Sequence, residues 1–256
     1  MKFQLIEEPL SRDVAPFGKK TVSRQIRDIV FVPGLCGSEY DWYQVSYKLN
    51  TNPLFFTSFL KKPSCCRTIG DYSGYIEKFV DISEDHPIFI AHSAGCLALV
   101  GAIENNSSRV GGVILINPSP YRGISLPFSS LRRNLRWPYI WSLMTGRYVI
   151  PIRDDQKFLA GGASVTFVPD SPWVSAQLGG PFGFQVPKLC NLGCKSLIIQ
   201  SNDDETIGRV ARNKIRAYHN VRTEIVSGGH YPHCHPDSQD IVAEIISNKL
   251  QEWGVI

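Results

Sequence analysis

A serine between small residues is the clearest chemical feature of this sequence. Ser93 is the centre of an Ala-His-Ser-Ala-Gly pentapeptide at positions 91–95. The apolar stretch 87–90 before it predicts a buried strand, and the small apolar stretch 96–103 after it predicts a buried helix. A serine at such a turn presents its hydroxyl at the edge of a sheet, in a strained backbone conformation that costs roughly 1–3 kcal/mol. The free N–H groups at the start of the helix can stabilise negative charge beside it.

Two polar turns further along the chain supply the groups that a serine nucleophile needs. A serine hydroxyl reacts at neutral pH only when a base removes its proton, and that base needs an orienting acid. Asp203 and Asp204 follow the predicted strand 196–200, and His230 follows the predicted strand 223–226. The carboxyl ends of parallel strands open on one side of a sheet, where such sites form. We therefore predict that His230 is the base and that one of the two aspartates is the acid.

The elements that must position these groups alternate along the chain. Strands are predicted at 28–32, 54–56, 87–90, 112–116, 196–200 and 223–226, and helices at 40–49, 72–81, 96–103 and 238–253. This alternation predicts an α/β fold, a mostly parallel sheet with helices on both faces. The alternation stops between 121 and 184. We predict a core of 1–120 and 185–256, with 121–184 as a lid insertion that is helical first and mostly loop after Gly161.

In these motifs the chain resembles serine-type members of the α/β-hydrolase superfamily, from about Asp28 onward. The triad members of that family follow in the order nucleophile, acid, base, as Ser93, Asp204 and His230 do here. The resemblance favours Asp204 as the acid and leaves Asp203, shifted by one residue, as the alternative. It matches the family's oxyanion loop to 33–37. The implied oxyanion donors are the backbone N–H groups of Leu35 and Ala94, and no cofactor or metal is implied.

The chain departs from the family pattern at four places. Ala91 replaces the usual first glycine of the pentapeptide, and Pro33 replaces the usual histidine before the oxyanion glycine. The loop 61–66 lacks the acidic, glycine-punctuated pattern common in relatives, and Gly208 stands where many relatives have proline. None of these changes removes a reacting group. They do prevent the transfer of a specific substrate from any one subfamily.

Aromatic and small residues predict an apolar substrate pocket. Binding sites are usually apolar with few polar groups. We expect Gly34 and Cys36 to line the pocket beside the oxyanion loop, and Trp137 and Trp141 to roof it. Tyr139 and Trp173 are expected to share this roof, and all four aromatic residues to form a small core of the lid. The basic group Arg132, Arg133 and Arg136 either attracts an anionic substrate, a carrier arm or an acidic membrane surface, or forms the solvated face of a lid helix.

Histidines and cysteines raise the question of a metal site. His230, His233 and His235 lie close together, but Pro232 and Pro236 stiffen the stretch, so we assign His230 to catalysis and predict no metal. His92 is expected to point away from the nucleophile into packing. Cysteine pairs at 65–66 and at 190 and 194 would allow a disulfide or metal, yet no ligand set with zinc spacing stands near them.

Length, composition, charge and cysteine content restrict the classes of protein to which this chain can belong. The chain has 256 residues, 43% of them hydrophobic, and a formal charge of +4, which demands no nucleic acid partner. The start of the chain turns acidic before a signal-peptide core, and no apolar stretch reaches membrane-spanning length. Seven irregularly spaced cysteines favour reduced thiols and a cytoplasmic location.

The sequence therefore predicts a hydrolase that cleaves a small-molecule carboxylic ester or thioester, free or carrier-bound, through an acyl-serine. Two alternatives remain open. The same fold and triad support lyases, cyclases, acyltransferases and enzymes that act on C–C bonds. A binding protein that has abandoned catalysis is the other alternative, against which the three retained reacting groups argue.

Overall fold

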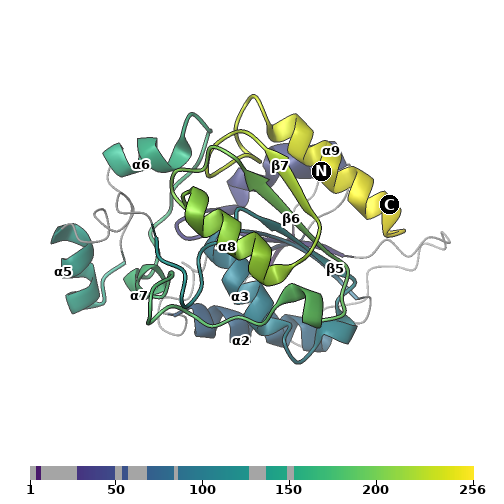
Figure 1. The fold of residues 1–256 in the computed structure, drawn as a ribbon, viewed down its shortest axis with the longest axis horizontal. Coiled ribbons are helices and arrows are strands. Elements are labelled where there is room, and N and C mark those ends of the chain that lie inside the picture. The colour runs from purple at the N-terminus through teal and green to yellow at the C-terminus, as the bar shows by residue number, and fades with distance from the viewer. Residues whose placement is uncertain are drawn as a thin grey trace.

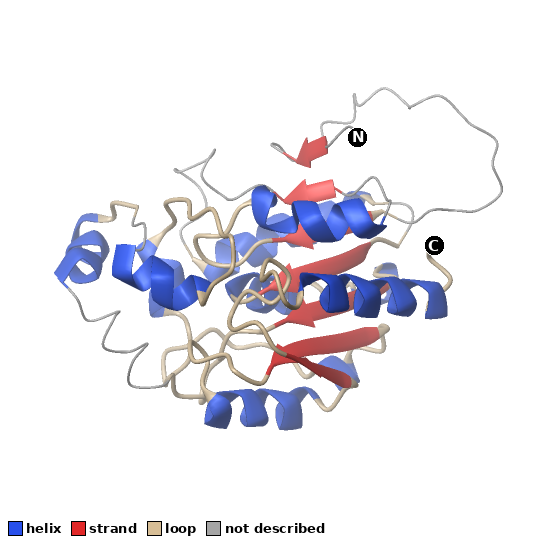
Figure 2. Cartoon of the chain, turned by 90° about the horizontal axis from the view of Figure 1, so that it is seen from above, coloured by secondary structure: helices blue, strands red, loops and turns tan. Residues whose placement is uncertain are grey.

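The computed structural model describes residues 4–6, 28–49, 54–56, 68–83, 86–126, 137–148 and 153–256. Their strands form one sheet with the order β1-β3-β2-β4-β5-β6-β7, and each neighbouring pair is parallel. The strands are β1 (Gln4–Ile6), β2 (Ile29–Val32), β3 (Leu54–Phe56), β4 (Ile88–His92), β5 (Gly112–Ile116), β6 (Ser196–Ser201) and β7 (Thr223–Val226). Their arrowheads point the same way in Figure 2. All their carboxyl ends therefore meet at one edge.

Alternating strand residues bury both faces of this sheet. Val30 and Val32 pack into one apolar cluster with helices α2 (Ile69–Ile82), α3 (Ala94–Ala102) and α8 (Arg209–His219). Ile29 and Phe31 pack into the other with α1 (Tyr43–Leu49) and α9 (Gln239–Glu252). Successive strand side chains point to opposite faces, so helices cover both sides, as Figure 1 shows. The predicted α/β-hydrolase fold class is confirmed.

The sequence predictions omit several described elements, of which two belong to the sheet and the helices that cover it. One is β1, which adds an edge strand beside β3. The other is α8, which turns Ala211 and Ile215 into the core. Gly208, with φ +74°, precedes α8, and Asn220 ends it in the left-handed conformation with φ +49°. The positive φ explains a glycine at 208, because a proline cannot adopt it.

Among the described residues, three α-helices lie between β5 and β6 in the chain. They are α5 (Trp137–Thr145), α6 (Arg153–Ala160) and α7 (Pro172–Ala176). They gather on the side of the molecule toward which the strands point (Figures 1 and 2). Short 3-10 helices complete the described elements at η1 (Glu39–Trp42), η3 (Ser107–Arg109) and η4 (Leu189–Asn191). The basic group Arg132, Arg133 and Arg136 and the loop 61–66 lie outside the described residues.

Among the described helices, none combines the length and the apolar character needed to cross a membrane.

Candidate active site

Ser93 occupies a strained turn between β4 and α3. Its backbone has φ +51° and ψ −121°, outside the regions that non-glycine residues normally adopt. A Cβ atom at Gly95 would lie 2.3 Å from the carbonyl oxygen of Pro33, and one at Gly34 would lie 2.9 Å from the Cβ of Ser93. The turn and the loop after β2 thus approach so closely that only glycine fits at both contacts.

The structure brings Ser93, His230 and Asp204 into one hydrogen-bonded chain. Nδ1 of His230 lies 2.8 Å from Oδ2 of Asp204, and Nε2 lies 2.9 Å from Oγ of Ser93. A carboxylate only accepts, so Nδ1 carries the proton and Nε2 is left to accept the proton of the serine hydroxyl. The three residues are 0–6% exposed, and low solvent access strengthens such bonds.

Backbone donors fix the carboxylate of Asp204. Its second oxygen, Oδ1, accepts from the N–H groups of Thr206 at 2.9 Å and Ile207 at 3.1 Å. The buried guanidinium of Arg212 donates to the carbonyl oxygens of Asn202 and Asp204. These contacts hold the β6 turn so that Oδ2 remains directed at the imidazole.

The neighbouring Asp203 has a different partner. Its carboxylate accepts from the N–H groups of Gly228 at 3.2 Å and Gly229 at 3.1 Å. It therefore contacts the backbone of the turn that carries His230 rather than the ring. Of the two aspartates considered from the sequence, the geometry directs Asp204 to the imidazole.

Two buried side chains hold the main chain of His230. Its carbonyl oxygen accepts from Nε2 of His92 at 2.8 Å and from Nδ2 of Asn117 at 3.0 Å. Asn117, which follows β5 with φ +42°, also donates to the carbonyl of Gly229. The ring of His92 is buried beside the rings of His230 and Tyr231 and supports the turn that carries His230. Asn117 was not singled out from the sequence, although an Asn-Pro pair directly after a buried strand marks such a turn.

The loop after β2 presents N–H groups near the nucleophile. Among the described residues, no acceptor bonds the N–H of Leu35 or that of Ala94. The next residue, Cys36, has φ +58° and is held on both sides: its N–H donates to Oδ2 of Asp170 at 3.1 Å, and its carbonyl accepts from Val168 at 3.0 Å. The left-handed turn at Cys36 is thus stabilised by a segment that follows α6.

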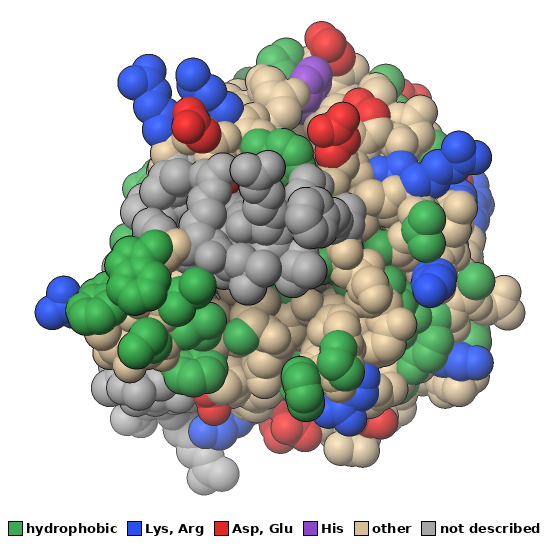
Figure 3. Space-filling view, turned by 60° about the vertical axis from the view of Figure 1, so that its left-hand side comes forward, with side chains coloured by type: hydrophobic (Ala, Val, Ile, Leu, Met, Phe, Trp, Pro, Cys, Tyr) green, Lys and Arg blue, Asp and Glu red, His purple; other side chains and the backbone are tan. Residues whose placement is uncertain are grey.

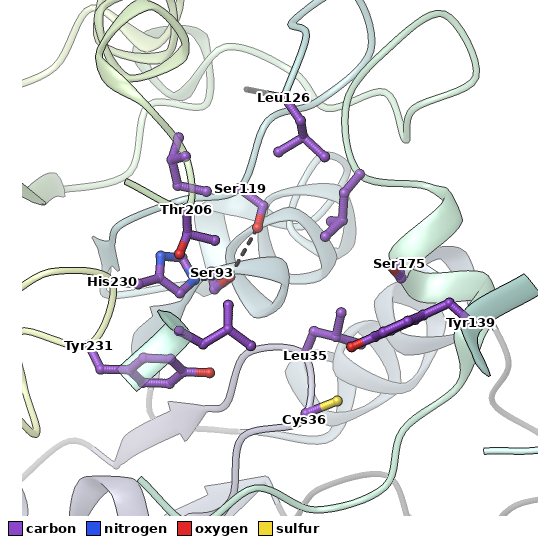
Figure 4. A pocket seen from close by; sticks show the side chains of 13 residues that line it. Leu35, Cys36, Ser93, Ser119, Leu126, Tyr139, Ser175, Thr206, His230 and Tyr231 are labelled. Carbon is purple, nitrogen blue, oxygen red and sulfur yellow. Dashed lines mark hydrogen bonds between the residues drawn. The ribbon is translucent and has the colours of Figure 1, made fainter. Parts of the chain in front are cut away.

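A mainly apolar cavity opens at Ser93 and His230 (Figure 4). Apolar and aromatic side chains form most of its wall: Leu35, Cys36, Leu126, Tyr139, Leu159, Leu178, Ile207 and Tyr231. Three hydroxyl groups, from Ser119, Ser175 and Thr206, complete it. The described lining contains no Lys, Arg, Asp or Glu side chain. The described wall of the cavity beside Ser93 is therefore uncharged and mostly apolar.

The residues expected in the pocket divide into two groups. Cys36 lines the cavity, and Gly34 lies against His92 and Ser93 behind it. Trp137 and Trp141 are not part of the described lining; their side chains are 65% and 47% exposed. Tyr139 from the same helix lines the cavity, and a two-residue step turns about 200° around a helix, so it faces the opposite way. In Figure 3 hydrophobic side chains gather on the surface on the side of α5.

The remaining histidines lie in packing. His233 is buried and its ring stacks on that of Trp42, with 4.3 Å between centroids. Burial lowers the pKa of His233 to about 3 and that of His92 well below its usual value, so both rings are neutral at pH 7. In the described part of the chain, no three His, Cys, Asp or Glu side chains converge as a metal site would require. Cys190 and Cys194 are free thiols, and Cys65 and Cys66 lie outside the described residues.

Comparison with known proteins identifies the family. The model of the Alpha/beta hydrolase family matches residues 29–244, so this chain belongs to that family. No curated protein matches the sequence. Among solved structures, MenH from S. aureus has a TM-score of 0.66 with 16% identity, covering 92% of this chain and 97% of its own.

Two further solved structures share the fold. Polyneuridine aldehyde esterase has a TM-score of 0.61 and 12% identity, covering 87% of this chain and 100% of its own. The thioesterase domain from the curacin biosynthetic pathway has a TM-score of 0.59 and 12% identity, covering 87% of this chain and 91% of its own. Identities this low show a common fold, and the reaction must be argued from the site.

Proposed function

We propose that this protein is a serine hydrolase that cleaves a carboxylic ester or thioester through an acyl-serine. Oγ of Ser93 attacks the carbonyl carbon while Nε2 of His230 takes its proton. Asp204 orients the ring and stabilises its charged form. The protonated imidazole then gives the proton to the leaving alcohol or thiol, and water, deprotonated by the same ring, releases the acid. The observation that carries this proposal is the continuous chain of contacts from Asp204 through His230 to Ser93, at 2.8 and 2.9 Å.

The negative oxygen that forms during attack needs donors that are already in place. We assign this role to the backbone N–H groups of Leu35 and Ala94, which flank the nucleophile and have no acceptor among the described residues. Preorganised donors act where charge develops and need no rearrangement during the reaction, so losing one costs about 3–4 kcal/mol in a well-measured protease.

The cavity wall supports a choice of substrate class. An apolar lining without described charged side chains fits an uncharged acyl or aryl group of a small molecule, free or attached to a carrier. Tyr139, Leu159, Ser175 and Leu178 reach the cavity from the stretch between β5 and β6. We therefore propose that residues 121–184 act as a lid that shapes the acyl site. The free thiols of Cys36, Cys96, Cys190, Cys194 and Cys234 favour a reducing, cytoplasmic location.

An active-site-directed fluorophosphonate tests the proposal. The wild-type protein is expected to gain the mass of one phosphonyl group on the peptide that contains Ser93. Ser93→Ala is expected to remain unlabelled, while Ser175→Ala, which removes a hydroxyl from another part of the cavity, keeps the label. Equal labelling of wild type and Ser93→Ala contradicts the assignment.

A panel of p-nitrophenyl esters and matched thioesters then tests the reaction. We expect a rapid burst of p-nitrophenol followed by steady turnover, with apolar acyl chains preferred over acyl chains that end in a carboxylate. Labelling of Ser93 without turnover of any ester or thioester contradicts hydrolysis and supports the lyase, cyclase or acyltransferase chemistry that the same triad permits.

A further inference from the structure

A second serine touches the nucleophile. Ser119 lies in the turn after β5 and is 1% exposed. Its Oγ is 3.0 Å from Oγ of Ser93, and the two hydroxyl groups face each other across the wall of the cavity (Figure 4). Its backbone N–H donates to the carbonyl oxygen of Ser93 at 3.2 Å. Ser119 therefore contacts the strained turn twice, once through its main chain and once through its hydroxyl.

The protons around the triad decide which hydroxyl donates. Nδ1 of His230 carries the ring proton, because it faces the carboxylate of Asp204. Nε2 then accepts the only hydroxyl proton of Ser93. With that proton engaged, Oγ of Ser93 has only lone pairs left for its second neighbour. In the reactive state the hydroxyl of Ser119 is therefore the donor and Oγ of Ser93 the acceptor.

We propose that Ser119 is a fourth catalytic residue, whose hydroxyl stabilises Oγ of Ser93 while its proton moves to His230. This inference rests on the proposed function. As the proton leaves, negative charge develops on Oγ of Ser93, and a hydrogen bond to a charged acceptor is roughly twice as strong as one between neutral groups. An interaction that strengthens on the way to the transition state accelerates the reaction.

The proton balance needs no further group. The bond from Oγ of Ser93 to the substrate carbonyl forms, its proton passes to Nε2, and Ser119 keeps its own proton throughout. In the acyl-enzyme, Oγ of Ser93 is an ester oxygen and a poor acceptor, so the contact weakens. During deacylation the same oxygen departs with negative charge, and the contact strengthens again. Both half-reactions therefore benefit.

The test separates the hydroxyl from the fold of the turn. Ser119→Ala removes the hydroxyl but retains the N–H that bonds the carbonyl of Ser93, so the turn keeps its main-chain support. Ser46→Ala is the matched control, because it removes a buried hydroxyl from α1, which contributes no residue to the described lining of the cavity. Ser119→Thr retains a hydroxyl. Rates are measured as the second-order constant for phosphonylation of Ser93 and as the burst rate with a p-nitrophenyl ester, and thermal melting reports the fold.

We expect Ser119→Ala to lower both rates about 10- to 100-fold, the range of one charge-assisted hydrogen bond, with KM changed less than about threefold. Ser46→Ala is expected to stay within about threefold of wild type, and Ser119→Thr to recover most of the loss. Wild-type rates in Ser119→Ala overturn the proposal, and so does an equal loss in a folded Ser119→Thr, which would assign the effect to packing. If Ser119→Ala does not fold, a folded Ser119→Cys replaces it; a weak thiol donor predicts reduced rates, and wild-type rates overturn the role.

Failure of this inference and failure of the proposed function give different results. If wild type itself is not labelled at Ser93, the acyl-serine mechanism is wrong. If wild type is labelled and Ser119→Ala is labelled equally fast, the triad stands and only the role of Ser119 is lost.

Discussion

The two halves of the site are held by different parts of the fold. Asp204 and His230 lie in short turns directly after β6 and β7, and the register of neighbouring parallel strands brings those turns together. The loop that carries Leu35 follows β2 and makes contacts of a different kind. Hydrogen bonds join it to residues 166 and 170, more than a hundred positions along the chain.

Two buried carboxylates make these long-range contacts. Asp170 accepts from the hydroxyl of Tyr72 at 2.7 Å and from the N–H of Cys36 at 3.1 Å. Asp41 accepts from the N–H groups of Ser38 at 2.9 Å and Thr166 at 3.2 Å. Burial raises the pKa of Asp170 above its usual range and that of Asp41 to about 6. The strand-end half of the site, Asp204 and His230, thus depends on the geometry of the sheet. The loop half, which carries Leu35 and Cys36, depends on two buried carboxyl groups, so a change of pH can weaken the contacts that hold it.

The largest effect is expected in the strand-end half. Asp204→Asn is predicted to lower kcat about 10³- to 10⁴-fold, because an amide in place of the carboxylate favours the wrong imidazole tautomer and does not stabilise its charged form. Steady-state kinetics on the best ester measures it, with thermal melting as the control for folding. A loss below tenfold would mean that Asp204 does not orient the base.

The loop half is tested by Asp170→Asn. An amide offers one acceptor where Asp170 now receives three donors, including the N–H of Ser171, so the turn at Cys36 loses support. We expect kcat to fall about 10- to 100-fold, with little change in KM, because the oxyanion donor at Leu35 shifts. Tyr72→Phe removes one donor and leaves the bond to Cys36 intact, so its loss should be several-fold smaller. Wild-type kcat in Asp170→Asn would show that the loop holds its shape without this carboxylate.

The pH dependence of the free energy of unfolding tests the loop half by itself, through Asp41. The pKa of Asp41 is raised on folding from 3.8 to about 6, so the folded state holds a proton that the unfolded state releases between these values. Its contribution to stability is complete below about pH 4 and is lost as pH rises through 6, a total change of about 3 kcal/mol. Buried His233 has a lowered pKa and acts in the opposite direction, so the wild-type curve alone is not diagnostic.

The measurement is therefore a difference between variants. Urea unfolding at pH 4.5 and 7.5 is compared for wild type and Asp41→Asn. The variant is expected to gain stability relative to wild type, by about 2 kcal/mol, on going from the lower to the higher pH. A difference that does not depend on pH would exclude titration of Asp41 in this range.

The smallest effect is expected for Asp203→Asn. Its carboxylate bonds only the main chain of the turn that carries His230, and an amide oxygen can still accept one of the two N–H groups. A decrease in kcat of less than about tenfold is predicted, with kinetics at several temperatures to reveal a loosened turn. If Asp203→Asn lost more activity than Asp204→Asn, the roles of the two aspartates would have to be exchanged.

Local sequence patterns were sufficient for most of the fold. Apolar runs at 29–32, 88–92 and 112–116 fit a sheet buried on both faces, where strands are continuously hydrophobic. Helix α8 was overlooked, although Ala211, Ile215 and Tyr218 have helical spacing and Gly208 precedes them. The short strand β1 carries too few residues for periodicity to reveal it.

The pocket was harder to predict than the triad. Trp137 and Trp141 were expected to face inward because large aromatic residues are usually buried, yet the face of α5 that lines the cavity carries Tyr139. Which face of a lone helix turns inward depends on neighbouring segments, here α7 and the stretch that carries Leu126. Ser119 gave no signal beyond its place after a strand, because a serine that touches a nucleophile does not differ locally from any other serine.

The sequence by itself predicted the alternation of strands and helices, apart from β1 and α8, and the residues proposed as nucleophile, base and candidate acids. These features depend on local periodicity and on turns whose residue types the backbone restricts. Only the tertiary structure decided that Asp204 and not Asp203 meets the imidazole, that Ser119 contacts Ser93, and that Asp170 holds the loop at Cys36. The reason is physical: hydrogen bonds need atoms within about 3 Å, and between residues far apart in the chain that distance is set by packing.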